Sequence, residues 1–398
     1  MDFTPTPEQQ AARDLAAEIF GDLSTHERLS ALGTGVDAEL WKALCAAGLP
    51  AAVEEIGLVG LVLLLEEQGR VTAQVPLAAS CAYGVLPVAV HGTAEQRARL
   101  LPALRDGTAV ATAAYRASSR PTAAARRTTE GWVLSGTFPV VPWLRAATHV
   151  LVPALTEEGR TRCFLIETQP VSAPTTSAPP APAQTTPDPT TPASTTPAQT
   201  APAVHSSGAP VRTESPIRTE SVETTAPWAA GRLTLHDAPA EPLGDDDGVW
   251  ADVLGRARTA FAGLQAGVCQ GSVARVVHHT SVREQFGRPL SAQQGVLLRA
   301  ADAHMDTEAI RVTAYEAAWR HDQRLPAATH ALTTAWWACE AGRRVVHAGQ
   351  HLHGGIGADV EHPVHRHFLW GRQLDAYLGP APALLAELGT LLTEEAAA

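Results

Sequence analysis

The sequence predicts an α+β protein with several domains: an N-terminal helical domain, a small central β domain and a C-terminal antiparallel four-helix bundle. Three observations lead to this fold class. Ala- and Leu-rich segments with helical spacing run from residue 7 to about 104 and return after about residue 250, and between them short β-branched runs alternate with turn residues. The long C-terminal helices with short connections favour a bundle. We expect the domains to span residues 1–107, 108–244 and 245–398.

Start and stop signals place the N-terminal helices. Pro7–Gln9 suits the first turn of a helix, because proline lacks the N–H that a first turn leaves unpaired. Leu23–Leu44 continues with helical texture, and Leu58–Gln68 forms a strongly apolar helix that ends at Gly69. Thr93–Gln96 has the pattern of a capping box and begins a further helix.

Short runs of β-branched and aromatic residues indicate strands in the central domain. They are Trp132–Leu134, Val150–Val152, Phe164–Ile166 and Arg232–Leu235. A Pro/Thr/Ala/Ser-rich tract at about residues 170–227 interrupts them. This composition buries too little apolar surface to offset the chain entropy, so we expect a disordered surface insertion. A glycosylated, mucin-like stalk is the alternative, but the N-terminus shows no secretory signal.

The C-terminal region has the spacing of long helices. Apolar residues recur every three or four positions through Val253, Ala257, Phe261, Leu264 and Val268. We expect a second long helix after Gln293 and a third over residues 326–348, with Pro326 in its first turn.

Bulk composition excludes some function classes. With 398 residues and a net charge of −11, the chain lacks the basic surface that a general nucleic-acid-binding protein needs. Its longest apolar run, Gly57–Leu65, is too short to span a bilayer. The five cysteines lie far apart without metal-binding spacing, which is typical of reduced thiols. We therefore expect a cytoplasmic protein with no membrane insertion and no nucleic-acid partner.

Histidines near the C-terminus raise the question of a metal site. They are His351, His353, His362, His365 and His367. His362 and His365 could share a helical face, but no glutamate or cysteine completes a familiar zinc-binding spacing. We therefore expect no metal.

Several short motifs occur in a characteristic order. They are Glu54–Gly57, Glu66–Arg70, Gly131–Thr137, Arg283–Pro289 with Gln294, and His351–Gly357. Together with the order of the domains, they resemble the acyl-CoA dehydrogenase family over almost the whole chain outside the Pro/Thr tract. The resemblance implies an FAD cofactor and an acyl-CoA substrate, with removal of a proton from Cα by a carboxylate and transfer of a hydride from Cβ to flavin N5. The task of the protein in that reaction is to orient the thioester and exclude water.

The resemblance also implies a flavin contact segment. Its residues are Arg283, Gln285, Phe286, Gln294, His351, Gly354 and Gly355. In the family such residues contact the FAD of a neighbouring subunit: an arginine can pair with the pyrophosphate in bidentate fashion, and glycines let the backbone come close. His351 stands where the family usually has a glutamine. The plainer alternatives are a solvated arginine at a helix end, a glycine pair that ends a helix, and a core histidine.

Both positions that the family uses for its catalytic base are apolar in this chain. Tyr377–Gly379 reads Tyr-Leu-Gly, with Leu378 where the family often has glutamate. The alternative position, counted back from the motif that begins at Arg283, is Ala257. Loss of a positioned general base costs about 10² to 10⁴ in rate. We therefore expect the isolated chain to be nearly inactive.

Three residues would lie near the acyl-CoA according to the same resemblance: Arg258, Tyr377 and Gly379. Arg258 matches a family arginine beside the active site. Asp375 and Glu361 are the nearby carboxylates. Asp375 is the candidate substitute base, although on a helix it lies almost opposite Tyr377.

The β domain departs from the family pattern. The family usually has Thr-Glu-Pro, then Gly-Ser, and a Trp-x-Thr that contact a subunit's own flavin, whereas this chain has Thr112–Ala117 and Val140–Pro142 there. Pro142 offers neither an N–H nor a hydroxyl to a flavin carbonyl. The chain thus retains the half of the site that serves a neighbour's flavin and lacks the half that holds its own.

These observations predict an acyl-CoA dehydrogenase-like flavoprotein subunit, which acts in α,β-desaturation of a CoA thioester within a hetero-oligomer whose homologous partner supplies the base. In texture the chain resembles the short actinobacterial-type subunits of sterol degradation, which work as mixed assemblies. Two alternatives stay open. One is a structural partner subunit without flavin or substrate of its own, and the other is a flavin oxidase or monooxygenase of the same fold.

Overall fold

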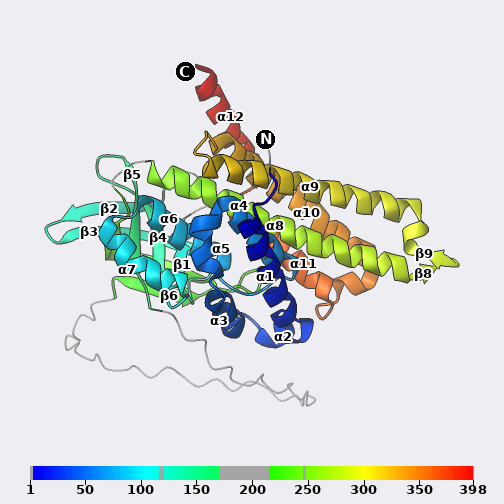
Figure 1. The fold of residues 1–398 in the computed structure, drawn as a ribbon. Coiled ribbons are helices and arrows are strands. Elements are labelled where there is room, and N and C mark those ends of the chain that lie inside the picture. The colour runs from blue at the N-terminus through cyan, green and yellow to red at the C-terminus, as the bar shows by residue number, and fades with distance from the viewer. Residues whose placement is uncertain (1–2, 116–120, 170–214, 245–247, 398) are drawn as a thin grey trace, which may run out of the picture.

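The computed structural model of the chain describes residues 3–115, 121–169, 215–244 and 248–397. Its elements follow the predicted order of helical, β and helical regions. The sheet lies at one end of the molecule and a small hairpin at the other, and the longest helix, α8 (Val249–Val282), runs between them (Figure 1). The predicted fold class is confirmed.

Helices make up the N-terminal region. They are α1 (Pro7–Leu23), α2 (His26–Leu32), α3 (Ala38–Ala46), α4 (Leu49–Arg70), α5 (Leu77–Ser80), a π-helical turn (Cys81–Val85), α6 (Leu86–His91) and α7 (Ala94–Arg105). Capping boxes at Thr6 and Thr93 begin α1 and α7, because each threonine side chain accepts from the backbone N–H of a glutamine, whose own side chain accepts from the threonine N–H. Both predicted helix starts are confirmed.

The central helix α4 packs along α8 at close range. A Cβ added to Gly267 would lie 2.1 Å from the carbonyl oxygen of Glu66, and one added to Gly69 would lie 2.3 Å from that of Leu264. The two backbones therefore touch where glycines remove the side chains. Burial on all sides explains why the segment Leu58–Gln68 is so strongly apolar.

A side chain from the bundle caps the second half of α4. The helix is broken at Gly57, whose φ is 71°. Asp322, the last residue of α9 (Gln294–Asp322), accepts hydrogen bonds from the N–H groups of Leu58 and Val59 at 2.8 and 3.0 Å. The contact joins the two helical regions and satisfies backbone donors that the break would leave unpaired.

The acidic motif at the end of α4 has a structural role. Glu66 is fully buried and accepts hydrogen bonds from Arg311 at 3.2 Å and from the hydroxyl of Tyr315 at 2.8 Å. Glu67 accepts from Arg13 of α1 at 3.1 Å. Because buried carboxylates need such partners, these contacts fix α4 against α9 and α1.

The central region is a seven-stranded sheet. Its strands are β1 (Ala111–Ala113), β2 (Ala123–Thr128), β3 (Gly131–Val141), β4 (His149–Leu155), β5 (Thr161–Glu167), β6 (Ile217–Ser221) and β7 (Gly231–Pro242). The order is β1-β4-β2-β3-β7-β5, and β5 also pairs with β4, so that five strands close on themselves while β6 adds to β7. Phe138 and Phe164 lie in the apolar cluster inside the sheet.

The predicted disordered insertion extends too far at its C-terminal end. Within residues 170–227, Ile217–Ser221 pairs antiparallel with β7. The N–H of Thr225 donates to Gln373 of α11 (Pro363–Leu378) at 3.0 Å. The strand-forming Ile and Thr of this short segment were outweighed by the composition of the surrounding tract. The rest of that prediction concerns residues 170–214, which lie outside the described residues.

Long helices form the C-terminal region. They are α8, α9, α10 (Ala328–His353), α11 and α12 (Ala381–Ala397). The strands β8 (Glu284–Gln285) and β9 (Arg288–Pro289) and a 3₁₀ turn (Leu290–Ala292) join α8 to α9, and a second 3₁₀ turn (Gly354–Ala358) joins α10 to α11. The start of α9 agrees with its prediction, whereas α10 begins after Pro326, which therefore does not occupy its first turn.

No single helix in the described part of the chain is long and apolar enough to cross a membrane. The pair α3–α4 meets the length and composition criteria only when both helices are taken together across a 74° bend, and most of α4 is buried inside the protein. All five cysteines are free thiols. Among the residues that the structure describes, no group of three or more His, Cys, Asp or Glu side chains could hold a metal ion.

Candidate functional site

The end of α8 turns into an exposed hairpin. Arg283 is the C-cap of α8, and its carbonyl oxygen accepts from the N–H of Leu290 at 2.9 Å, which closes the loop. Phe286 and Gly287 have positive φ values of 55° and 75°, and Phe286 is 92% exposed. An aromatic ring held in solvent on a tight turn is typical of a surface that contacts another molecule.

A cavity of about 560 Å³ lies between this hairpin and the glycine turn that ends α10. Four of the predicted flavin-contact residues line it: Arg283, His351, Gly354 and Gly355. Gly354 has a φ of 65°, and no atom lies within 4 Å of the position of a Cβ on either glycine. The turn therefore presents open backbone, and we refer to this space as the turn cavity.

The other predicted contact residues lie beside the turn cavity and do not line it. The side chain of Gln285 donates to the carbonyl oxygen of Glu284 at 2.9 Å. Gln294 is exposed at the first residue of α9, and Phe286 projects from the hairpin. A second chain would have to cover this surface for all seven residues to contact one ligand.

The donor set of the turn cavity fits the diphosphate of a dinucleotide. Arg283 is exposed and makes no ion pair with any described residue, and no carboxylate lines the cavity. A guanidinium pairs with phosphate oxygens in bidentate fashion, and open glycine backbone allows a close approach. Arg283, Gly354 and Gly355 are the residues that could hold such a group.

Six aromatic residues meet where the N-terminal helices, the sheet and the bundle join. They are Tyr83, Tyr115, Trp228, Trp250, Phe261 and Tyr377, which we call the aromatic junction. The hydroxyl of Tyr83 lies 2.8 Å from that of Tyr115 and 2.5 Å from that of Tyr377. The ring centroids of Phe261 and Tyr377 are 4.7 Å apart, and those of Tyr115 and Trp250 are 5.1 Å apart. Edge-to-face rings at these distances stabilise one another beyond the area they bury.

The tyrosines of the aromatic junction stay neutral near pH 7. Burial raises the pKa of Tyr83 and of Tyr377 well above the usual value, and it also raises the pKa of Tyr115. A neutral phenol is not a base for a carbon-bound proton. The junction therefore supplies packing and hydrogen bonds.

Both predicted base positions lie in the main hydrophobic core. Leu378 is 5% exposed and Ala257 is 1% exposed. Gly379, which follows Leu378, has a φ of 105°, and its carbonyl oxygen accepts from the thiol of Cys339 at 3.1 Å. The apolar residues at these positions are thus part of the packing between the bundle helices.

Arg258 is paired inside the chain. Its guanidinium donates two hydrogen bonds to the carboxylate of Glu387 on α12, at 2.9 and 2.8 Å, and the arginine is buried. A bidentate pair of this kind fixes α12 on α8. Contact of Arg258 with an acyl-CoA, which the resemblance implies, stays a prediction.

Asp375 lies away from the aromatic junction on α11. Its carboxylate pairs with Arg372 at 3.2 Å. Burial raises the pKa of Asp375, and the charges of Arg372 and of Arg343 on α10 oppose that shift. Asp375 therefore interacts with the charged residues of α10, whereas Tyr377 on the same helix contacts the junction.

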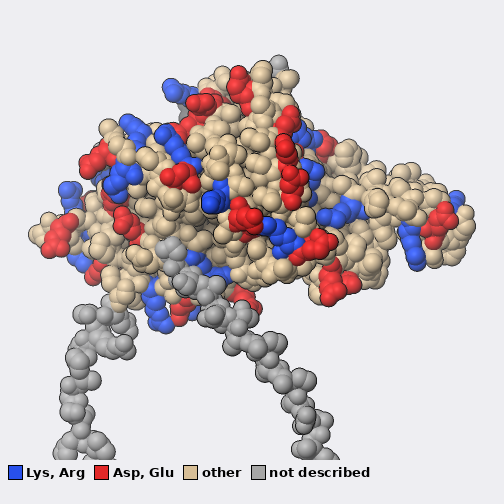
Figure 2. Space-filling view, turned by 60° about the horizontal axis from the view of Figure 1, so that its bottom comes forward, with Lys and Arg blue, Asp and Glu red and all other residues tan. Residues whose placement is uncertain are grey.

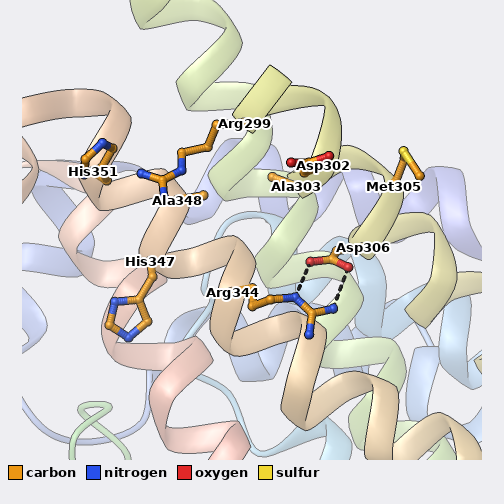
Figure 3. A pocket seen from close by; sticks show the side chains of 9 residues that line it. All are labelled: Arg299, Asp302, Ala303, Met305, Asp306, Arg344, His347, Ala348 and His351. Carbon is orange, nitrogen blue, oxygen red and sulfur yellow. Dashed lines mark hydrogen bonds and ion pairs between the residues drawn. The ribbon is translucent and has the colours of Figure 1, made fainter. Parts of the chain in front are cut away.

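A groove of about 630 Å³ runs between α9 and α10 (Figure 3). Arg344 forms two hydrogen bonds with Asp306 across it, at 2.8 and 2.7 Å. Arg299 extends toward the end of α10 near His351, and Met305 on the rim is 68% exposed. Paired charges beside exposed apolar side chains are typical of the rim of a protein–protein contact.

Further apolar side chains are exposed on the lobe that carries the turn cavity. They are Val277, Val282, Leu297 and Leu298. On the face in Figure 2, acidic and basic side chains are intermixed, and the tip of the lobe that ends in the hairpin carries both. The exposed apolar side chains of this lobe are expected of a surface that another chain covers.

Sequence patterns give no sign of the aromatic junction. Tyr83, Tyr115 and Trp250 lie on elements far apart in the chain, and only Tyr377 belongs to a recognisable motif. Each ring taken alone is an ordinary core residue. The cluster exists only in the folded chain, so no local spacing could have revealed it.

Comparisons with known proteins point to one family. Residues 6–108 match the family model for the acyl-CoA dehydrogenase N-terminal domain, and residues 248–387 match the one for the acyl-CoA dehydrogenase C-terminal domain. The chain is 31% identical to acyl-CoA dehydrogenase FadE27 of Mycobacterium tuberculosis over 99% of both chains. It is 26% identical to acyl-CoA dehydrogenase FadE28 of the same organism over 98% of both chains.

Solved structures agree with this assignment. The Tcur3481-Tcur3483 steroid ACAD is 37% identical with a TM-score of 0.82, over 98% of this chain and 99% of that one. The ChsE4-ChsE5 complex from Mycobacterium tuberculosis is 27% identical with a TM-score of 0.82, over 99% of both chains. Butyryl-CoA dehydrogenase from Megasphaera elsdenii, at 20% identity and a TM-score of 0.77 over 99% of this chain and 100% of that one, shares the fold.

Proposed function

Because the chain belongs to the acyl-CoA dehydrogenase family, we propose that it is one subunit of an acyl-CoA dehydrogenase built from unlike chains. A homologous partner supplies the catalytic carboxylate and holds the flavin ring, and this chain contributes its turn cavity to the partner's FAD. The observation that carries the proposal is the contrast between the open, cationic turn cavity and the apolar packing at Leu378 and Ala257.

The chemistry of the reaction explains why a partner is needed. FAD, when bound, accepts a hydride from the substrate. The proton on Cα requires a base within hydrogen-bond reach. Leu378 cannot accept a proton, and the hydroxyl of Tyr377 is hydrogen-bonded to Tyr83 at 2.5 Å. The residues of this chain therefore support cofactor binding and not proton transfer.

The β domain gives little support for a flavin ring held by this chain. The hydroxyl of Thr112 is buried and donates to the carbonyl oxygen of Pro142 at 2.6 Å. Trp143, with a φ of 58°, stacks on Trp228 at a centroid distance of 5.8 Å. The segments that would face the ring are thus engaged in contacts within the chain, which also weighs against an independent flavin oxidase or monooxygenase.

The turn cavity, by contrast, supports the contribution to a neighbour's cofactor. Arg283 would pair with the pyrophosphate, and the backbone at Gly354 and Gly355 would approach it closely. Phe286 and the apolar side chains around it would be covered by the partner, since such residues are typical of interface cores. The part of FAD that the turn cavity fits is therefore its diphosphate.

The comparisons support the class of partner and substrate. Two of the similar structures carry the names of two chains, ChsE4-ChsE5 and Tcur3481-Tcur3483. The second of these is a steroid ACAD. A homologous but unlike chain is therefore the partner that we propose, and a steroid-derived acyl-CoA is the substrate class that this likeness favours.

Flavin stoichiometry tests the proposal. The chain expressed alone should bind FAD weakly, whereas co-expression with its partner should give one FAD per pair and flavin reduction by acyl-CoA. Arg283→Ala should weaken flavin retention in the pair because the pyrophosphate loses a bidentate donor. Arg218→Ala, on the exposed strand β6, removes the same charge far from the cavity and should have no effect. A homotetramer with one FAD per chain would contradict the proposal.

A purely structural subunit is the second candidate function. The aromatic junction favours it, because its tyrosine hydroxyls are satisfied by one another. Such a subunit would stabilise its partner without contacting flavin. In that case Arg283→Ala would leave flavin retention in the pair unchanged, and the two functions are separated by this measurement.

A further inference from the structure

A second cavity, of about 530 Å³, lies next to the turn cavity against the last turns of α8. Its polar lining consists of Arg275, His278, His279, Arg283, His353 and His362, and we refer to it as the histidine–arginine pocket. Three of these residues also border the turn cavity, whereas Arg275, His278 and His362 do not. No carboxylate lines the pocket.

Three helices bring these side chains together. On α8, Arg275, His279 and Arg283 follow one another at intervals of four residues and so share one face. His353 is the last residue of α10. His362 is the N-cap of α11, and its Nδ1 accepts from the N–H of Val364 at 3.2 Å. The pocket thus depends on the tertiary fold.

Arg275 is a cation without a counter-charge. It is half-buried, and its guanidinium makes no ion pair or hydrogen bond with a described residue. Burial lowers its pKa. A partly buried charge without a partner is costly, so this position indicates an anion that the chain alone does not supply.

Three of the histidine rings lie next to one another, with His279 stacked on His353 at 25° and His362 tilted by 58° against His353. The centroids of His279 and His353 are 4.7 Å apart, and those of His353 and His362 are 5.1 Å apart. Nδ1 of His353 lies 2.7 Å from the carbonyl oxygen of Gly349, so this nitrogen donates and Nε2 remains for a ligand. Burial is the first cause that lowers the pKa of all three histidines, and neighbouring cationic groups add to it, including Arg275 for His353 and His362.

Charged groups around the pocket are mostly of the same sign. His26 of α2 lowers the pKa of His362, and Arg275 lowers that of His367 on α11. Asp359 acts in the opposite direction on His362, while its carboxylate accepts from the N–H of Glu361 at 3.0 Å. An anion inside the pocket would meet an excess of positive potential.

We propose that the histidine–arginine pocket binds a phosphoryl group, held by Arg275 and by protonated histidine rings. Guanidinium pairs with phosphate oxygens in bidentate fashion, and protonated His279 and His353 offer further N–H donors. His362, whose Nδ1 accepts from Val364, can donate through Nε2–H as a neutral ring. Because the rings take up protons when the dianion binds, affinity rises as the pH falls. The site goes beyond the proposed function and does not depend on it.

Anion titration of the isolated chain by calorimetry tests the proposal. Inorganic phosphate is the first probe, and sulfate, whose charge is constant between about pH 6 and pH 8, is the probe for proton uptake. Sulfate should bind more tightly at the lower pH, by up to about tenfold per pH unit for each proton taken up. Arg275→Ala should weaken both anions by about tenfold or more, and Arg275→Lys should recover part of the affinity.

Arg299→Ala is the matched control. Arg299 is an exposed arginine of the neighbouring groove without an ion pair to a described residue, so its removal changes the net charge equally and should leave anion affinity unchanged. Equal losses in Arg275→Ala and Arg299→Ala would overturn the proposal. Thermal melts of each variant verify folding, and Arg275→Gln replaces Arg275→Ala if the latter fails to fold.

ADP, titrated in parallel, identifies the source of the phosphoryl group. ADP that binds more tightly than phosphate and is weakened by Arg275→Ala indicates a nucleotide, whereas equal affinities indicate free phosphate, and both results support the site. Absence of binding of all three anions to the wild-type chain overturns it. If Arg275→Ala then also impairs assembly with the partner, a carboxylate of the partner occupies the pocket instead.

Discussion

The turn cavity and the aromatic junction lie toward opposite ends of α8 and differ in the state of their polar groups. At the turn cavity, Arg283 has no ion pair with a described residue and the backbone of Gly354 is open. At the junction, the hydroxyl of Tyr83 is shared with two other tyrosines. Beside it, Arg258 is held by Glu387.

This difference separates groups that serve a ligand from groups that serve the fold. Buried polar groups in a folded chain find partners, and a group that has none indicates a missing ligand or chain. The tyrosine hydroxyls of the junction meet this expectation, whereas the indole N–H of Trp228 is buried without a partner among the described residues. Arg283 at the hairpin end is exposed and has no ion pair with a described residue, so it is available to a ligand. This distribution agrees with the proposed role of a subunit that supports the site of another chain.

The largest expected effect concerns turnover. The isolated chain should oxidise acyl-CoA about 10² to 10⁴ times more slowly than the complex with its partner, because Leu378 and Ala257 cannot act as bases. Leu378→Glu alone should not restore activity, since the new carboxylate would be buried without a partner and held protonated. Stopped-flow absorbance, which monitors flavin reduction by a panel of acyl-CoA thioesters, measures the turnover of the isolated chain, of the complex and of Leu378→Glu.

Two controls accompany this prediction. Leu378→Met preserves the apolar volume and should leave folding and partner-dependent activity intact. Full turnover by the isolated chain, unchanged in Asp375→Asn, would place the base at a residue outside both positions. The interpretation that the turn cavity serves a ligand whereas the aromatic junction serves only the fold would then be wrong.

The next effect tests whether the junction is a packed core and the hairpin a free surface. Tyr377→Ala should lower the free energy of unfolding by about 3 to 5 kcal/mol, because it removes ring contacts and leaves a cavity. Tyr377→Phe should cost about 1 kcal/mol through the lost hydrogen bonds. Phe286→Ala removes a ring that is 92% exposed and should change the free energy of unfolding by less than about 0.5 kcal/mol.

Urea unfolding of the isolated chain measures all three variants. A large loss in Phe286→Ala would show that the hairpin packs on its own chain, and a negligible loss in Tyr377→Ala would show that the junction is loosely packed. The comparison is sharpest if Phe286→Ala is neutral in the isolated chain and weakens assembly with the partner.

A smaller effect concerns acid stability and involves α11, which links the two regions. Burial lowers the pKa of His367 on α11 and of His321 on α9 to about 4. The unfolded rings titrate near pH 6.5, so the unfolded chain takes up these protons first as the pH falls. The stabilisation is therefore complete above about pH 6.5 and is lost between there and about pH 4, at up to about 3 kcal/mol for each ring.

His367→Gln isolates one of these contributions. The glutamine cannot titrate, so its free energy of unfolding should fall less steeply than that of the wild type between about pH 6.5 and pH 4.5. Denaturant unfolding at several pH values measures the slope. Parallel curves for the two proteins would show that the pKa of His367 is the same in the folded and the unfolded chain.

The hairpin end could be predicted from the sequence much better than the junction. Arg283 and the glycine pair lie in contiguous motifs, and the turn needs the conformational freedom of Gly354, whose φ is 65°. Helix starts at Thr6 and Thr93 were likewise visible, because capping is local. The pair of Arg258 with Glu387, 129 residues apart, arises only from packing between helices. The same holds for the rings around Tyr377.

The smallest expected effect is the change in melting temperature when the Pro/Thr tract is deleted. A longer deletion tests whether β6, which precedes Trp228 of the aromatic junction, contributes to stability. Deletion of residues 172–212 should shift the melting temperature by less than about 3 °C, because the composition offers little apolar area to bury.

Deletion of residues 171–225 also removes β6, with its five paired residues on β7, and the hydrogen bond of Thr225 to Gln373. It should lower the melting temperature by more and alter the near-UV circular dichroism, since the segment leads directly into Trp228, which stacks on Trp143 and contacts Tyr377. A large loss with the shorter deletion would show that the tract packs on the body. Equally small losses of melting temperature in the two deletion variants would mean that the aromatic junction holds Trp228 in place without β6. The stability of the junction would then come from its contacts with the bundle helices.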